Sequence, residues 1–201
     1  MKIIINLFLI IFSFTVHSFE TEIKYSIFFH SDKIDIKLFF QPGNELTSSF
    51  LLPQKMDKIE QLDSPSHQFN IEENLIKFNV RVNEPIILCY SYKIEAIEAE
   101  DFFKFDGEDF FIIPDLNIDK EIPIKLEWQE IPIDWILANS YGIQMHSQKI
   151  NNLNALHQGV YFWGKFSLIS YDGIHIISTS EALPFNQIYT LLQTIMQEHQ
   201  Q

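Results

Sequence analysis

The sequence predicts a mainly β protein, with an antiparallel, sandwich-like domain from about residue 19 to residue 183 and one amphipathic helix after it. Three observations support this prediction. Hydrophobic residues make up 46% of the 201 residues, which is enough for the core of one domain. Apolar and polar residues alternate along most of the chain, as in strands that have one buried face. Apolar residues that recur at helical spacing are confined to the last part of the chain.

Residues 1 to 18 have the pattern of a secretory signal peptide. Lys2 precedes an apolar run from Ile3 to Val16, and Val16 and Ser18 form a suitable cleavage pair. The run is shorter than the roughly 20 apolar residues that span a bilayer, which argues against a retained membrane anchor. We therefore expect cleavage after Ser18 and a secreted or periplasmic protein, with no membrane association once the signal peptide is removed.

The first strands are predicted by strict alternation. A hairpin is expected over residues 21–40, around the polar break at 30–33, and a short strand over 48–52 that Pro53 ends. Residues 54–73 are polar with isolated apolar positions, so we expect irregular loop there. The alternating segments 74–82 and 86–94 predict a second strand pair.

Cys89, in the second of these segments, is the only cysteine, so no intramolecular disulfide can form. Its apolar neighbours favour a buried strand cysteine that acts as a small hydrophobic residue, rather than a catalytic thiol. Residues 95–109 are dense in acids but lack the spacing of a calcium-binding loop, so we expect a solvated acidic loop rather than a metal site.

The second half of the domain predicts further strands at 110–113 and 122–131, with Pro123 and Pro132 at edges or strand ends. Asp172-Gly173 between the β-rich segments 159–170 and 174–179 favours a tight hairpin. We expect Trp135→Ala to cost roughly 3–5 kcal/mol, because we expect this side chain to be buried. The candidate core residues are Trp128, Trp135, Phe110, Phe111 and Phe166.

A helix is predicted over residues 184–201, with Pro184 in its first turn. Its apolar residues recur at helical spacing and form one face, which needs another surface to cover it. These residues are Phe185, Ile188, Leu191, Leu192, Ile195 and Met196.

Charge and composition exclude several classes of function. The formal charge of −13 argues against a nucleic-acid partner, because binding to phosphates needs clustered cations. The two common glycine-rich nucleotide-binding motifs do not occur in the sequence. Neither the H-E-x-x-H zinc motif nor the G-x-S-x-G nucleophile motif occurs in it. A Ser-His-Asp triad built from distant residues leaves no motif, so that alternative stays open. We therefore assign no catalytic, cofactor-binding or metal-binding residue and expect no cofactor.

Several segments resemble the amino-terminal domain of the M61 glycyl aminopeptidase family in order and spacing. They comprise Gly107–Asp115, Ile122–Trp128, Ile131–Trp135 and Asn139–Gly142, together with Leu51–Pro53, Leu88–Ile94 and Gly159–Phe166. In that family the β-rich domain precedes a catalytic domain whose helix carries H-E-x-x-H, with a zinc-bound water as nucleophile. The resemblance thus implies that residues 19–183 form the non-catalytic domain, and that the helix from Pro184 begins a catalytic domain absent from this sequence.

Three functions follow from these observations. The first is an exported, non-catalytic module that is not an enzyme by itself and comes from a truncated peptidase. The second is half of a split peptidase, in which a separately encoded catalytic domain binds through the helix from Pro184 to Gln201. The third is an independent secreted β-sandwich that binds a peptide, glycan or protein partner through Tyr141, Tyr161 and Trp163, although alternating aromatic residues more often form the core. The sequence does not determine an oligomeric state.

Overall fold

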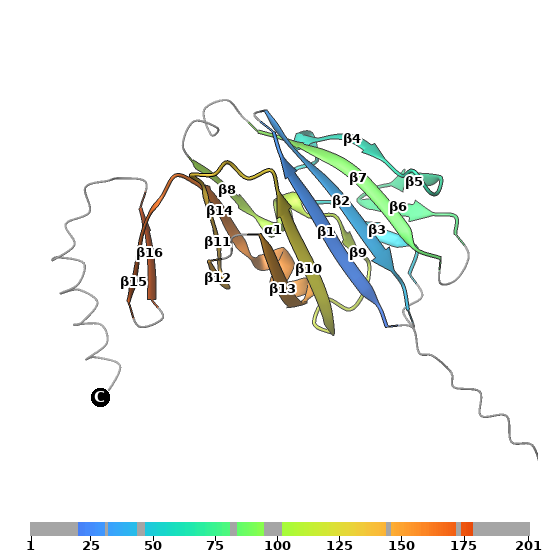
Figure 1. Cartoon of the computed structure of the whole chain (residues 1–201). Helices are drawn as coiled ribbons and strands as arrows, with labels where there is room; N and C mark the ends of the chain where they lie inside the picture. The colour runs from blue at the N-terminus through green and yellow to red at the C-terminus, as the bar shows by residue number, and fades with distance from the viewer. Residues whose placement is uncertain are drawn as a thin grey trace, which may run out of the picture.

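The computed structural model describes residues 20–30, 32–43, 47–80, 84–94, 102–143, 146–171 and 174–178. These residues form a mainly β structure with two short helices (Figure 1). Within these ranges, every helix is too short or too polar to span a bilayer. The expected signal peptide, residues 1–18, and the expected helix, residues 184–201, both lie outside the described residues.

The largest sheet has six strands in the order β13-β10-β1-β2-β7-β4. All pairs are antiparallel except β1 and β10, which run parallel. The strands are β1 (Glu22–Phe29), β2 (Lys33–Gln41), β4 (Ile59–Asp63), β7 (Ile86–Lys93), β10 (Glu121–Gln129) and β13 (Ser147–Asn152).

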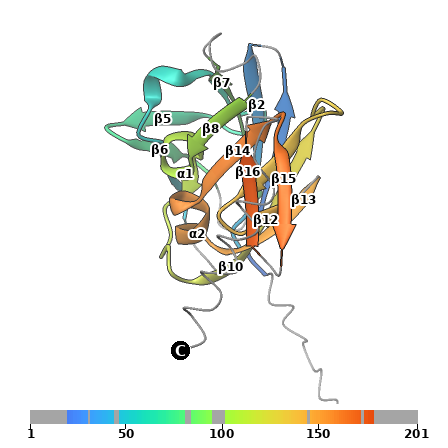
Figure 2. The ribbon, with the colours of Figure 1, turned by 90° about the vertical axis from the view of Figure 1, so that its left-hand side faces the viewer.

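Two four-stranded sheets, ordered β12-β11-β14-β8 and β5-β6-β3-β9, form the opposite side of the sandwich. The β15–β16 hairpin lies at the left end of Figure 1 and faces the viewer in Figure 2. The remaining elements are β3 (Ser49–Leu51), η1 (Met56–Lys58), β5 (Phe69–Glu72), β6 (Leu75–Phe78), β8 (Phe102–Asp106), α1 (Gly107–Phe110), β9 (Ile113–Pro114), β11 (Ile136–Asn139), β12 (Gly142–Ile143), α2 (Leu153–Gln158), β14 (Val160–Gly164), β15 (Ser167–Tyr171) and β16 (Ile174–Ser178).

The apolar and polar residues that alternate in the sequence become the buried and the more exposed side chains of the strands. In β1, buried residues from Ile23 to Phe29 alternate with partly exposed ones, and β2 pairs with it so that Tyr25 lies opposite Leu38. The outward face carries ion pairs such as that between Lys24 and Glu127, with 2.7 Å between Nζ and Oε2. One face of the large sheet is therefore apolar and packs inward, and the other is largely polar.

Aromatic rings join the layers. Phe29 of the large sheet meets Trp163 of the facing sheet edge to face, with ring centroids 4.4 Å apart. Phe40 meets Phe50 of the other small sheet at 5.5 Å. Such pairs contribute about 0.5–1.5 kcal/mol beyond the burial of their area. The six-stranded sheet thus shares one continuous core with both smaller sheets.

Two buried tyrosines hold the segment around α1 against the large sheet. The Tyr25 hydroxyl donates to the carbonyl of Ile112 at 2.7 Å, and the Tyr90 hydroxyl donates to that of Phe110 at 3.2 Å. Burial raises the pKa of both hydroxyls, so they remain protonated donors. Their hydrogen bonds satisfy polar groups that would otherwise be costly to bury.

Gly107 lets the two helices approach closely. A Cβ at this position would lie 2.0 Å from the carbonyl oxygen of Leu156 and 2.8 Å from that of His157 in α2. The Gly107 amide donates to the carbonyl of Gly159 at 2.8 Å. No side chain fits here without a backbone shift, which gives a structural reason for glycine at the start of the segment 107–115.

The structure confirms the fold class and several individual predictions. The hairpin over 21–40 is β1 and β2, and the strand at 86–94 is β7. Tyr171 pairs with Ile174 in the antiparallel pair of β15 and β16, as expected for a tight hairpin, and Asp172 and Gly173 lie outside the described residues. The strand predicted over 122–131 is β10, and Pro123 lies where its register with β13 shifts, so the missing amide breaks no regular ladder.

One loop prediction and two strand predictions are wrong in part. Residues 54–73, expected to be loop, contain η1, β4 and β5, because edge strands tolerate the polar residues that hid them. The strand predicted at 110–113 is instead the end of α1 and the start of β9, since Phe111 and Ile112 are buried between the layers rather than within one sheet. Of the strand predicted over 74–82, residues 75–78 form β6, residues 79–80 lie beyond its end, and residues 81–82 lie outside the described residues.

Two of the five core candidates are not in the core. Trp128, Phe110 and Phe111 are buried as expected. Trp135 and Phe166 are only partly buried, because both lie on loops between strands. Cys89 also departs from the prediction: it lies in β7 but on the outward face, where it is partly exposed.

Candidate functional site

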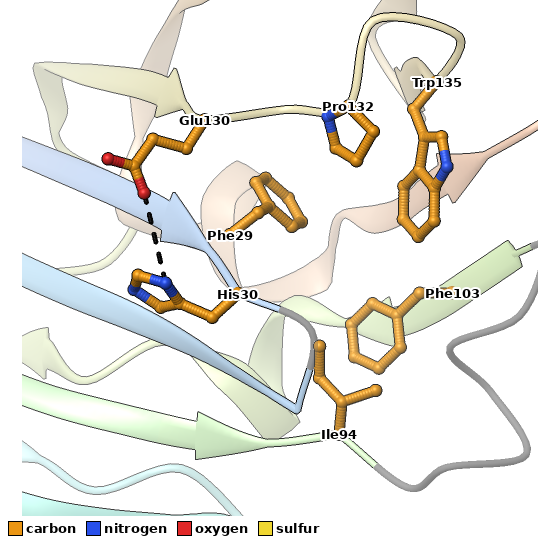
Figure 3. Close-up of a pocket in the computed structure, with 7 residues that line it drawn as sticks. All are labelled: Phe29, His30, Ile94, Phe103, Glu130, Pro132 and Trp135. Atoms are coloured by element: carbon orange, nitrogen blue, oxygen red, sulfur yellow. Dashed lines mark ion pairs between the residues drawn. The ribbon is translucent and has the colours of Figure 1, made fainter.

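An apolar pocket of about 310 Å³ opens at one end of the sandwich (Figure 3). It lies where β1 and β7 end, beside β8 and the loop that follows β10. This volume is at the lower limit of typical ligand pockets, roughly 300–1,000 Å³. The lining residues are Phe29, His30, Ile94, Phe103, Glu130, Pro132 and Trp135.

The floor and walls of the pocket are rigid. Phe29 is 8% exposed and Phe103 is 2% exposed, and both rings contact the buried Trp163. Phe103 also contacts Tyr92, with ring centroids 6.2 Å apart. These rings are therefore fixed by the core, so the pocket is preformed rather than created by a ligand.

The loop 130–135 forms the outer wall. The amide of Trp135 donates to the carbonyl of Pro132 at 3.0 Å, which closes a turn. Ile133 lies at the tip of this turn and is fully exposed, with a relative exposure of 104%. The turn thus directs the Trp135 indole toward the pocket in Figure 3 while it presents Ile133 to solvent.

Two ionisable side chains line one side of the pocket, His30 and Glu130. His30 Nε2 lies 3.0 Å from Asp35 Oδ2, whereas His30 Nδ1 lies 4.0 Å from Glu130 Oε2. Asp35 also contacts Lys33 at 3.1 Å. His30 is therefore held mainly by Asp35, and the Glu130 carboxylate makes only a long contact to it.

Partial desolvation raises the pKa of Asp35, but the opposing effects are larger in sum. Hydrogen bonds from Ser91 and Lys33, with the charges of Lys33 and His30, lower the pKa of this carboxyl below its ordinary value. Asp35 is therefore ionised at neutral pH and is a weak proton acceptor.

A second, more polar pocket of about 420 Å³ shares His30 and Glu130 with the first. The Ser91 hydroxyl donates to Asp35 Oδ1 at 2.6 Å, and the same hydroxyl lies 3.3 Å from Gln61 Oε1. The order here is serine, aspartate, histidine, so the imidazole is not hydrogen-bonded to the serine as it is in a catalytic triad. The arrangement orients His30 rather than activating Ser91.

Cys89 lines this polar pocket too. Desolvation raises the pKa of its thiol, and the charges of Asp63 and Asp35 add to that effect against the opposing charge of Lys37. The group is consequently a thiol rather than a thiolate at neutral pH, and the thiolate is the reactive form.

The aromatic residues proposed from the sequence as ligand contacts lie elsewhere. Tyr161 and Trp163 are fully buried, which confirms core packing. Tyr141 is 50% exposed, and its hydroxyl donates to the carbonyl of Ala155 at 2.8 Å, so it supports α2. Among the described parts of the chain, no group of three or more His, Cys, Asp or Glu side chains is placed to hold a metal ion.

Sequence reasoning missed most of the pocket because its residues come from four separate segments. The sequence pattern places His30 in a hairpin turn and Phe103 in an acidic loop. The one usable signal is the sequence Pro132-x-x-Trp135, which places an aromatic residue directly after a turn.

The fold resembles part of a larger peptidase. The structure is similar to that of the aminopeptidase N family protein from Idiomarina loihiensis, with a TM-score of 0.61 and 16% sequence identity. The match covers 85% of this chain and 35% of that one, so this chain spans about a third of its length. It confirms, at the level of the fold, the resemblance to the β-rich part of an aminopeptidase.

A second match, to Legionella pneumophila aminopeptidase A, has a TM-score of 0.43 and 14% identity, over 79% of this chain and 23% of that one. A score this low carries no argument. No protein-family model and no curated protein matches the sequence.

Proposed function

We propose that this chain is an exported, non-catalytic β module of a metallo-aminopeptidase resembling the M61 family, from a truncated or split enzyme. The observation that carries the proposal is the fold, which 85% of the chain shares with about a third of an aminopeptidase. The described residues then correspond to a supporting domain, and hydrolysis belongs to another domain. The absence of H-E-x-x-H from the sequence agrees with that division.

The first test is hydrolysis by the purified chain. Peptides that begin with glycine or alanine, each with a chromogenic leaving group, are incubated with the protein with and without added zinc. We expect no release above that from the Trp163→Ala variant, which serves as an unfolded control. Chelator-sensitive release by the intact chain alone would contradict the proposal.

The split-enzyme form of the proposal makes a genetic and a biochemical prediction. A neighbouring reading frame would encode H-E-x-x-H, and its product would gain aminopeptidase activity on mixing with this chain. A version ending at residue 183 should fold equally well but fail to restore activity, because residues 184–201 would supply the contact. If activity is restored equally by both versions, the helix is not the contact.

We also propose export with cleavage after Ser18, from the pattern of residues 1–18. The test is to express the whole chain in a bacterium with an outer membrane and to measure the mass of the protein in the periplasmic fraction. We expect an amino terminus at Phe19. Recovery of the uncleaved chain in the membrane fraction would overturn this assignment.

The second candidate function, an independent secreted binding module, is favoured by the preformed pocket. In that case the isolated chain binds its partner without any peptidase. A Trp135→Ala variant would then lose binding while its melting temperature stays within a few degrees of the original. Loss of folding in this variant would remove the support for a binding role.

A further inference from the structure

We propose that the apolar pocket is a binding site for an arginine side chain presented by a protein partner. The inference goes beyond the proposed function, because it concerns the chemistry of the pocket and holds whichever protein supplies the arginine. It rests on three features of the site: aromatic walls, a carboxylate with spare capacity, and a volume suited to one long side chain.

The aromatic walls suit a planar cation. The rings of Phe29, Phe103 and Trp135 border the opening in Figure 3, and the first two are fixed by contacts with the core. Aromatic faces carry partial negative charge and attract cations within about 6 Å. Phe29 and Phe103 are 8% and 2% exposed, so the face open to a cation is that of the partly buried Trp135. A guanidinium group can stack on this indole face, and its aliphatic stem can pack against Ile94 and Pro132.

The carboxylate of Glu130 supplies the matching charge. Its side chain is 61% exposed, and its described ion pair, with His30 at 4.0 Å, is longer than a hydrogen bond. The other acid of the loop, Asp134, is paired with Lys165 at 3.0 Å, and Asp35 is engaged by Lys33, His30 and Ser91. Glu130 is therefore the carboxylate at this site that retains capacity to accept two parallel bonds from a guanidinium.

Backbone geometry supports a specific role for Glu130. Its φ is +60°, a left-handed conformation that is unfavourable for a residue with a Cβ. Among the described residues, Glu73, in the tight turn between β5 and β6, and Gln61, at the irregular pairing of β4 with β7, have similar φ values. The fold thus accepts local strain at the residue that places a carboxylate beside the aromatic walls.

Charge complementarity favours a cationic partner over a purely apolar one. An apolar side chain that filled the pocket would shield Glu130 from water without providing a partner, which is costly. The formal charge of −13 adds a long-range attraction for basic protein surfaces. Arginine combines both requirements, since it has an apolar stem and a cationic head.

The test is an NMR titration of the exported chain with four capped tripeptides, Ac-Gly-X-Gly-NH₂, where X is arginine, citrulline, norleucine or lysine. Citrulline has nearly the shape of arginine without its charge. The reporter is the indole N–H resonance of Trp135, assigned by its loss in Trp135→Phe. We expect saturable shifts with arginine and about tenfold weaker binding of citrulline, norleucine and lysine.

Two charge-removing variants make the test specific. In Glu130→Gln, the preference for arginine over citrulline should disappear, whereas citrulline binding should not change. Glu121→Gln, which alters an exposed glutamate at the far end of β10, should retain the full preference. Added salt should weaken arginine binding and leave citrulline binding unchanged.

Several results would overturn the proposal. Equal binding of arginine and norleucine would show a purely apolar pocket, and equal binding of lysine would remove the role of the guanidinium plane. A full arginine preference in Glu130→Gln would place the cation elsewhere. None of these results depends on peptidase activity, so failure here is distinguishable from failure of the proposed function.

Discussion

Two tryptophans on either side of one loop have opposite roles. Trp128 belongs to β10, is 2% exposed, and contacts Phe29, Tyr161 and Trp163. Trp135 follows the turn at Pro132, is partly buried and lines the pocket. Each directly follows an acidic residue in the sequence, yet only the first belongs to the core.

The difference teaches that strand alternation, rather than residue type, decides burial in this domain. Trp128 occupies the inward position of a strand whose neighbours on both sides supply a complementary surface. Trp135 lies in the loop between β10 and β11, where it packs against the core but stays partly exposed. That exposed part of the side chain is what makes a binding surface available.

The largest effect is expected in the core shared by the sheets. Trp163→Ala should cost about 3–5 kcal/mol of unfolding free energy, because the ring is fully buried among aromatic side chains. Chemical denaturation measures the loss. A cost below about 1 kcal/mol would contradict the buried position and the comparison built on it.

Gly107→Ala is expected to cost about 1–3 kcal/mol, because the added methyl group overlaps the carbonyl of Leu156 and the backbone of α1 or α2 must move. Gly142→Ala is the matched comparison: no atom lies within 4 Å, and only its φ of +136° is unfavourable. Thermal unfolding of both variants tests the order. If Gly107→Ala unfolds at the temperature of the original chain, close helix contact is not the reason for glycine at 107.

Trp135→Ala should cost only about 1 kcal/mol, since the indole is partly buried. This value replaces the larger loss expected from the sequence. Chemical denaturation of Trp135→Ala and Trp163→Ala under the same conditions compares the two losses of unfolding free energy directly. A loss as large as that of Trp163→Ala would mean that the loop 130–135 is part of the core rather than the wall of a pocket.

The smallest effect concerns Asp35, whose side chain is 37% exposed. Its pKa is lowered in the folded state, so ionised Asp35 stabilises the fold above its ordinary pKa of 3.8, and this contribution is lost as pH falls through the folded value. Asp35→Asn should therefore cost less than about 1 kcal/mol at pH 7. The difference from the original chain should shrink below pH 4; a difference independent of pH would exclude this charge as its source.

The sequence predicted those elements whose signal is local. Alternation in residues 21–40 identified the first hairpin, and Asp172-Gly173 identified the last one. It failed for β4 and β5 because these edge strands are only partly buried and do not alternate regularly between apolar and polar residues. It failed again at 110–113, because Phe110 to Ile113 are buried on all sides, and periodicity cannot separate a short helix from a strand there.

The candidate site was largely beyond prediction for a different reason. Phe29, Phe103 and Trp135 are far apart in sequence and meet only through sheet pairing and the layering of two sheets. No local sequence pattern indicates that these residues lie close together. The loop Ile131–Trp135 was noticed for its resemblance to a family, but neither the exposure of Ile133 nor the strain at Glu130 could be read from residue types.

By itself, the sequence determined the β class, the inward faces of β1 and β2 and the lack of a zinc-binding motif, because these depend on neighbouring residues and on composition. Only the tertiary structure decided which aromatic residues are buried, why position 107 requires glycine and which carboxylate borders the pocket. Those properties depend on distances between segments remote in the chain, and such distances are set by how the sheets pack.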